Sequence, residues 1–137
     1  MEILTLDGVQ KLVAAAVTKA KADFNRPICV SVCDECGFLV AFARMEGAPL
    51  RSIEISQNKA FTAVRIGVPT DKFQARLERD HLLASYFGER MTPLPGGNLL
   101  TDPKGKVLGA IGVSGLALNE DQSITESVAE LANSGKL

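Results

Sequence analysis

The stretch from Val107 to Gly115 reads Val-Leu-Gly-Ala-Ile-Gly-Val-Ser-Gly, and it decides the fold. An Asp-Pro-Lys-Gly segment at residues 102–105 precedes it, and that pattern is typical of a tight turn. The residues from Val107 to Val113 favour a strand, but glycine weakens a strand, so the three glycines need a physical reason. Because the usual reason is a close approach by another backbone, a helix or a ligand, we predict a sheet surface that packs against a helix or a neighbouring subunit.

Size and charge set the class of protein. A chain of 137 residues is expected to form one domain, residues 1–137, with a core of its own. Because the net charge is −1, a general binder of the nucleic-acid backbone, which needs a basic excess, is not expected. The N-terminus lacks the basic and then apolar pattern of a signal peptide, and no apolar run is long enough to span a membrane. We therefore expect a soluble cytoplasmic protein.

The spacing of apolar residues predicts the other elements. Helical periodicity predicts helices at 6–24 and 50–64, a helical or broken-helical segment at 70–87, and a last helix from Asn119. Thr5, Thr70, and Asn119 with Gln122 are the expected N-terminal caps. Alternating residues predict strands at 28–33 and 38–43, and a second hairpin at 98–101 and 106–114, whereas 89–94 is either a short strand or a loop. Short turns between consecutive strands favour an antiparallel sheet with flanking helices, an α+β fold.

Five motifs then occur in a fixed order along the chain. Val32–Val40 reads V-x-D-x-x-G-x-L-V, and it is followed by Arg44–Ala48, Lys59–Ala63, Pro95–Gly97 and Gly109–Gly115. In this order the motifs resemble the GlcG/HbpS-like family of haem-binding proteins. The C-terminal domain of PduO-type cobalamin adenosyltransferases belongs to the same family. The resemblance covers the chain from Leu4 to about Val128.

The resemblance implies a profilin-like fold, in which helices flank a five-stranded antiparallel sheet in the order α-β-β-α-α-β-β-β-α. It also implies homo-oligomers, tetramers or octamers, and haem binding in some members. Members occur near glycolate, glycerol and propanediol pathways, and no catalytic activity is attached to the family as a whole. One departure is visible, because the family often reads Gly-Gly-x-Pro-Ile whereas Asn98 and two leucines follow Gly97. The shape of this loop, and of any ligand site that it forms, is therefore not carried over.

Several side chains could bind the iron of a haem. His81 is the single histidine, and imidazole is the commonest axial donor, but its charged neighbours also fit an ordinary surface histidine. The other candidate donors are Met45, Met91, Cys33 and Cys36. The spacing of the last two is C-x-x-C, but a strand precedes it and Gly37 follows, so ordinary strand and turn cysteines are favoured over a metal or redox site.

Two cations and one glycine pair are candidate ligand contacts. Arg44 or Lys59 could bind a haem propionate, or either could form an ion pair with Asp34, Glu46 or Glu54. Gly96 and Gly97, with Asn98 beside them, could present backbone N–H groups to an anion, or the glycines could simply turn the chain.

These residues favour a binding protein over an enzyme. The first hypothesis is a homo-oligomer that sequesters or delivers haem or a related flat apolar ligand. The second is an accessory or assembly protein for a cobalamin-dependent glycerol, diol or glycolate system, with a metabolic enzyme as partner. The third, an enzyme acting with cobalamin or on a small organic acid, has little support, because no nucleophile, base and electrophile gather in the sequence. Ser114 departs from the Gly-x-Ser-x-Gly pattern of hydrolases.

Overall fold

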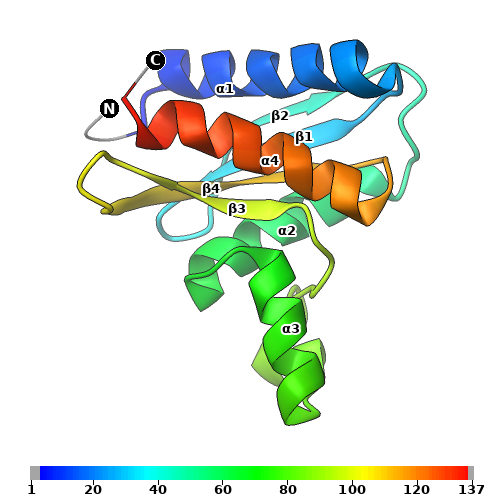
Figure 1. Cartoon of the computed structure of the whole chain (residues 1–137), viewed down its shortest axis with the longest axis vertical. Coiled ribbons are helices and arrows are strands. Elements are labelled where there is room, and N and C mark those ends of the chain that lie inside the picture. Colours follow the sequence, from blue (N-terminus) through cyan, green and yellow to red (C-terminus); the bar gives the residue numbers. More distant parts are fainter. Residues whose placement is uncertain (1–3, 136–137) are drawn as a thin grey trace.

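The computed structural model describes residues 4–135, which form one antiparallel sheet between two layers of helices (Figure 1). A π-helical turn, η1, extends the first helix, and a 3₁₀ turn, η2, follows the third. In chain order the elements are α1 (Leu6–Lys19), η1 (Ala20–Phe24), β1 (Cys29–Asp34), β2 (Leu39–Arg44), α2 (Ser52–Ile66), α3 (Thr70–Asp80), η2 (Ala84–Phe87), β3 (Gly97–Thr101), β4 (Val107–Ser114) and α4 (Leu118–Asn133).

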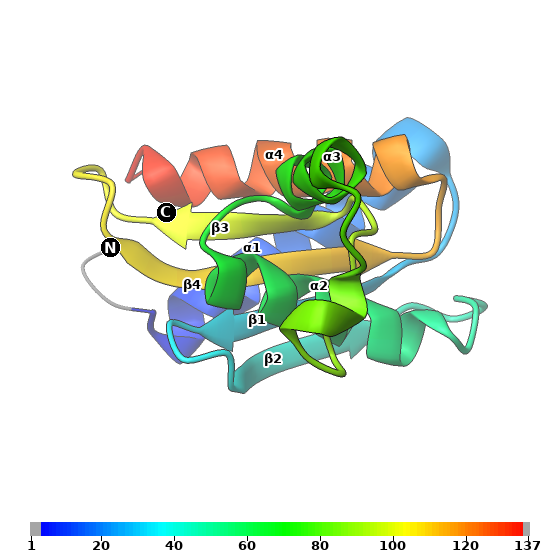
Figure 2. The ribbon, with the colours of Figure 1, turned by 90° about the horizontal axis from the view of Figure 1, so that it is seen from below.

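The four strands lie in the order β2-β1-β4-β3, and every neighbouring pair is antiparallel. Helices α1 and α4 cover one face of this sheet, α2 crosses the other face, and α3 projects away from the body (Figures 1 and 2). The α+β prediction and the antiparallel sheet are confirmed. Among the described residues none of the helices combines the length and the apolar character that crossing a membrane requires.

The prediction of five strands is wrong for the described residues, because 89–94 forms no strand. Its backbone is held by a helix instead of a neighbouring strand: the Thr62 hydroxyl of α2 accepts a hydrogen bond from the Thr92 N–H at 3.0 Å. Pro93 and Pro95 also lack the N–H groups that a ladder would need. The segment therefore runs along α2 as an irregular connection.

The caps that the sequence predicted are partly correct. Thr5 caps α1, and its hydroxyl accepts from the Gly8 N–H at 3.0 Å. Thr70 lies inside α3, whose cap is Pro69, because the Thr70 hydroxyl is used elsewhere. Helix α4 starts at Leu118 rather than Asn119.

The cap of α4 is Ala117, and the Ala117 N–H donates to the Glu120 carboxylate at 3.0 Å. Glu120, and not Gln122, therefore supplies the side-chain acceptor at this end of the helix.

The face covered by α1 and α4 holds an aliphatic core. Side chains from both helices and from the central strands are removed from water there, which supplies the main hydrophobic stabilisation of the fold. Its fully buried members include Val9, Leu12, Val30, Val32, Leu100, Ile111, Val113 and Ile124.

The face covered by α2 is built from small and polar residues. The inward positions of α2 follow helical spacing and are all buried: Ser52, Ser56, Lys59 and Thr62. A Cβ atom on Gly112 of β4 would clash with the Ser56 carbonyl oxygen and lie 2.7 Å from the Ala60 nitrogen. The glycine therefore lets the helix backbone lie directly on the strand, and the predicted packing of this glycine strand against a helix is confirmed.

Candidate ligand-binding site

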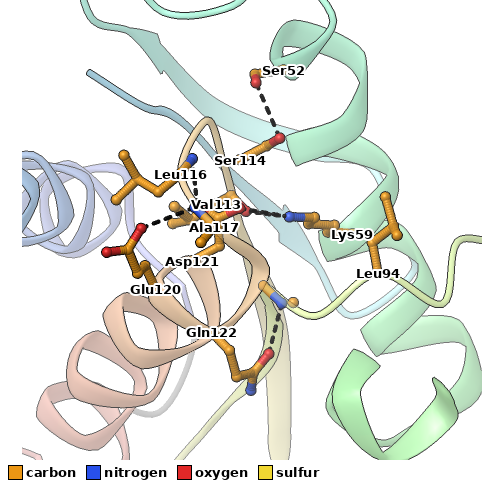
Figure 3. A network of polar contacts seen from close by, with 12 residues as sticks. Ser52, Lys59, Leu94, Val113, Ser114, Leu116, Ala117, Glu120, Asp121 and Gln122 are labelled. Carbon is orange, nitrogen blue, oxygen red and sulfur yellow. Dashed lines mark hydrogen bonds and ion pairs between the residues drawn. The ribbon is translucent and has the colours of Figure 1, made fainter. Parts of the chain in front are cut away.

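A buried ion pair joins the two helix layers at one end of the sheet (Figure 3). The Lys59 ammonium of α2 donates to the Asp121 carboxylate of α4 at 3.1 Å and to the Val113 carbonyl oxygen of β4 at 2.9 Å. Both side chains are 1% exposed. The Asp121 carboxylate also accepts from the Leu116 N–H at 3.1 Å, so the loop before α4 is tied to the same pair.

Gly96 makes room for this pair. Its φ is +123°, a conformation that favours glycine, and a Cβ atom there would lie 2.7 Å from the Lys59 nitrogen. The Gly96 N–H donates to the Gln122 side-chain oxygen at 2.7 Å, and the Gly97 N–H donates to the Thr70 hydroxyl at 2.9 Å. Both N–H groups that could have met an anion therefore have acceptors within the chain.

Burial governs the electrostatics of the pair. It lowers the pKa of Lys59 and raises the pKa of Asp121, because water is excluded from both charges, and each partner opposes the shift of the other. Lys59 is thus an internal connection between α2 and α4. Its ion-pair partner is Asp121, which was not among the acids that the sequence suggested.

Two hydroxyl pairs continue the polar contact between α2 and the sheet. The hydroxyls of Ser31 and Ser56 share a hydrogen bond of 2.8 Å, and Ser114 donates to Ser52 at 3.1 Å (Figure 3). Each joins a strand residue to an α2 residue in a buried position. The placement of α2 on the sheet is therefore fixed by directed hydrogen bonds as well as by contact.

The side of α2 that lies toward β2 borders an open cleft of about 400 Å³. This volume is within the range of small-molecule sites. Phe38 and Leu39 both line it, and these two adjacent apolar side chains are 68% and 52% exposed. The lining residues are Cys33, Gly37, Phe38, Leu39, Glu54, Gln57, Asn58, Ala60 and Arg90.

One arginine, Arg90, lines this cleft, and its guanidinium stacks against the ring of Phe61, as does that of Arg65. The guanidinium carbons of Arg90 and Arg65 lie 4.0 Å and 4.7 Å from the ring centroid. Arg90 donates to the Asn58 side-chain oxygen at 3.1 Å, and Arg65 donates to the Cys36 carbonyl oxygen at 2.9 Å. The cleft therefore combines an apolar wall with one positioned cation, Arg90, and one acid, Glu54. The apolar wall and the cation suit a flat apolar ligand that carries a carboxylate.

The cleft also contains a sulfur atom. Cys33 is 3% exposed, and burial raises the pKa of its thiol to about 12, so the thiol is protonated at neutral pH. Cys36, three residues further, is exposed on the turn. Among the described residues that line the cleft, Cys33 is the one of a kind that commonly ligates haem iron.

The other predicted contacts lie elsewhere. Helix α3 and the turn η2 together form an arm that projects from the sheet (Figure 1). His81 ends α3 in a left-handed conformation with φ 55° and is exposed on this projecting arm. Arg44 lies at the end of β2 that is remote from the cleft, and Met45 borders a different, smaller cleft near Pro27. The Asn98 side chain accepts from the neighbouring Leu99 N–H at 2.8 Å.

Of the candidates named from the sequence, the structure therefore brings only Cys33 into the cleft. Sequence reasoning missed Phe38 and Arg90. The sequence did contain an indication of Phe38 as a binding residue, because the apolar run after Gly37 continues without a charge through residue 43.

Comparisons with known proteins agree on one family. A family model described as haem degrading protein HbpS-like matches residues 4–130. An uncharacterised 15.0 kDa protein in the dhaT-dhaS intergenic region of Citrobacter freundii is 32% identical over 132 residues, 93% of this chain and 90% of that protein. The corrinoid adenosyltransferase PduO of the same organism is 28% identical over 133 residues, 95% of this chain but 39% of that protein. The crystal structure of a PduOC:heme complex has a TM-score of 0.85 and 26% identity, covering 96% of both chains.

Proposed function

This chain belongs to the HbpS-like family, and from that membership we propose that it binds haem or a related tetrapyrrole. It does so without turnover, as a cytoplasmic homo-oligomer that sequesters or delivers the ligand. The observation that carries the proposal is the cleft beside α2, which combines exposed apolar side chains, an arginine and a buried sulfur. The haem in the related PduOC complex supports the same ligand class.

The lining residues fit the parts of a haem. Phe38 and Leu39 would contact the apolar macrocycle, which would release their exposed surface from water. Arg90 would bind a propionate, because a guanidinium pairs well with a carboxylate. Since the cleft is open, one edge of the macrocycle would stay in solvent.

Cys33 is the donor that the cleft offers to the iron. Its thiol must lose a proton to bind a metal, and the high pKa means that binding releases this proton into solution. Bound haem would supply an iron centre whose chemistry the axial ligand tunes. His81 lies outside this cleft and remains a predicted iron ligand. It would ligate only a haem that binds against the projecting arm.

A haemin titration followed by absorbance tests the proposal. The wild-type protein should give a saturable shift of the Soret band. Phe38→Asp and Arg90→Glu should each weaken binding by about tenfold or more, because one removes apolar contact and the other repels a propionate. Tyr86→Asp is the matched control, since Tyr86 is 67% exposed and borders none of the described clefts.

Two further variants assign the iron ligand. Cys33→Ser should move the Soret maximum while His81→Ala leaves it in place. Loss of binding in His81→Ala, with full binding in Phe38→Asp, would place the site on the arm and contradict the cleft.

A corrinoid-linked role is the second candidate, and the relatives favour it specifically. One relative is a corrinoid adenosyltransferase, and another is named by its place between dhaT and dhaS. In this role the chain is an accessory or assembly protein for a cobalamin-dependent glycerol or diol system, and a metabolic enzyme is its partner. Parallel titrations with cobalamin and with haemin distinguish the two candidate functions, because the corrinoid-linked role predicts tighter binding of the corrinoid. A pull-down provides a second test, in which this role predicts recovery of a diol-metabolising enzyme.

A further inference from the structure

Two opposite charges line the cleft beside α2 without neutralising each other. They belong to Arg90 and Glu54, and within residues 4–135 neither takes part in an ion pair. Two other charges nearby are directed elsewhere. The Asp34 carboxylate accepts from backbone N–H groups of its own hairpin turn, and the Arg65 guanidinium donates to the Cys36 carbonyl oxygen. In the described part of the cleft, a bound molecule therefore meets one cation and one acid.

The two charges lie at different positions along α2. Glu54 and Asn58 are four residues apart, so their side chains share one face of the helix and are about 6 Å apart along its axis. The Arg90 guanidinium is held further along, because it donates to the Asn58 side-chain oxygen at 3.1 Å and lies 4.0 Å from the centre of the Phe61 ring. The cleft therefore has a negative end at Glu54 and a positive end between Asn58 and Phe61.

The apolar wall of the same cleft restricts where a ligand's charge can lie. Phe38 and Leu39 offer hydrocarbon to a bound molecule, and both are more than half exposed without it. A carboxylate placed against them would lose water without gaining a cation, which is unfavourable. The favourable place for a carboxylate in this cleft is therefore the end at Arg90.

We propose that Glu54 determines which tetrapyrroles the cleft accepts, by rejecting rings that carry a carboxylate on the edge opposite Arg90. This inference rests on the proposed function. The two propionates of haem stand on neighbouring pyrroles, so both can lie at the Arg90 end while the methyl and vinyl edge lies toward Glu54 and the apolar wall. A porphyrin with a propionate on every pyrrole brings a carboxylate to Glu54 or to the wall in every orientation. Like charges brought together in this way are a common source of specificity.

Parallel absorbance titrations with haemin and with iron(III) coproporphyrin III test the proposal. The two ligands share the ring and the metal, and the second has propionates where the first has vinyl groups. The wild-type protein should bind the coproporphyrin about tenfold more weakly or worse. Because the cleft is open to solvent, added salt should reduce this difference by screening the repulsion.

Variants of Glu54 separate its charge from the effect of the apolar wall. Glu54→Gln keeps the size of the side chain and should bind the coproporphyrin about fivefold or more tightly than the wild type, with little change for haemin. Glu54→Lys should give a larger gain in coproporphyrin affinity, because it adds a cation at that end. Glu54 is exposed, so both variants should fold, which circular dichroism checks.

Glu130→Gln is the matched control. It makes the same change in net charge at an exposed position of α4, and Glu130 borders none of the described clefts. This variant should bind both porphyrins like the wild type. A gain in coproporphyrin affinity as large as that of Glu54→Gln would mean that net charge, and not the position of Glu54, sets the preference.

Equal wild-type affinities for the two porphyrins, or a difference that Glu54→Gln leaves unchanged, would overturn the role of Glu54. Haemin binding in the same titrations would leave the proposed function standing. Failure of the wild-type protein to bind haemin would overturn the proposed function, and the selectivity with it.

Discussion

The two faces of the sheet meet their helices through different chemistry. Toward α1 and α4 the contact is aliphatic, with members such as Leu12, Ile111 and Ile124. Toward α2 it is made by serines, a threonine, a lysine and a glycine, joined by buried hydrogen bonds. The first contact is non-directional and tolerates small shifts, whereas the second places α2 at one position, and the candidate cleft depends on that position.

Breaking the ion pair should give the largest loss of stability. Lys59→Met leaves the Asp121 carboxylate buried without its cation, which costs about 3–5 kcal/mol. Urea unfolding measures the loss. The double variant Lys59→Met, Asp121→Leu should recover much of it, because neither charge is then buried, and a double variant as unstable as the single one would contradict this account of the pair.

The same variant should depend on pH in a defined direction. Burial already raises the pKa of Asp121, and removal of Lys59 takes away an influence that lowers it. A carboxyl whose folded-state pKa is raised favours the folded state at low pH, and that stability is lost as pH rises through the folded-state value. The penalty of Lys59→Met should therefore be smaller near pH 4 than at pH 7, and a penalty that grows on acidification would argue against a charged Asp121.

Adjacent residues of β4 allow the two faces to be compared directly. Ile111→Ala removes buried methyl groups from the aliphatic face and should cost about 2–5 kcal/mol while leaving haemin affinity near the wild-type value. Gly112→Ala should cost about 1–3 kcal/mol, because α2 must move away from the added Cβ, and it should also weaken haemin binding. Equal effects of the two variants on haemin affinity would contradict the claim that haemin binding depends on the α2 face and not on the aliphatic face.

Removing the hydrogen bond between Ser31 and Ser56 should give a smaller loss of stability. Ser31→Ala leaves the Ser56 hydroxyl short of one buried partner and should cost about 1 kcal/mol in thermal or urea unfolding. Ser31→Ala, Ser56→Ala should cost little more than the single variant, since both polar groups are then gone. A strongly additive double variant would mean that the hydroxyls act through packing alone.

Thiol reactivity probes the α2 face with no change in sequence. Cys36 is exposed and should react with an alkylating reagent within minutes at neutral pH. Cys33 should react far more slowly, with a rate that rises until the pH approaches the pKa of about 12. Peptide mass mapping distinguishes the two cysteines. Equal alkylation rates of Cys33 and Cys36 at pH 7 would show that Cys33 is open to solvent.

Much of the fold follows from periodicity. Leu12 and its neighbours mark the buried face of α1, and alternation marks β1 and β2, because burial on one side imposes a fixed period. Of the glycines of β4, Gly112 correctly indicated a close helix, whereas Gly109 lies against the Cys33 backbone of the neighbouring strand β1. The extra strand at 89–94 could not be excluded, because what keeps this segment irregular is a hydrogen bond from Thr92 to Thr62, thirty residues away.

The candidate site was less accessible to sequence reasoning. Lys59 was identified as a residue of interest, but an isolated lysine does not reveal that Asp121 lies 62 positions away in the same buried contact. Arg90 was missed because its role depends on stacking against Phe61 in another element. Such sites are formed by tertiary contacts between segments that are distant in the sequence, and the spacing of residues within one segment does not reveal these contacts.

Hydrogen exchange with and without haemin tests most directly that the α2 face is the binding face. We predict new protection in the backbone of residues 37–39 and 54–60 and around Arg90, with none near Pro27 and Met45 at the remote end of β2. Protection confined to the remote end, or to the arm around His81, would contradict the account.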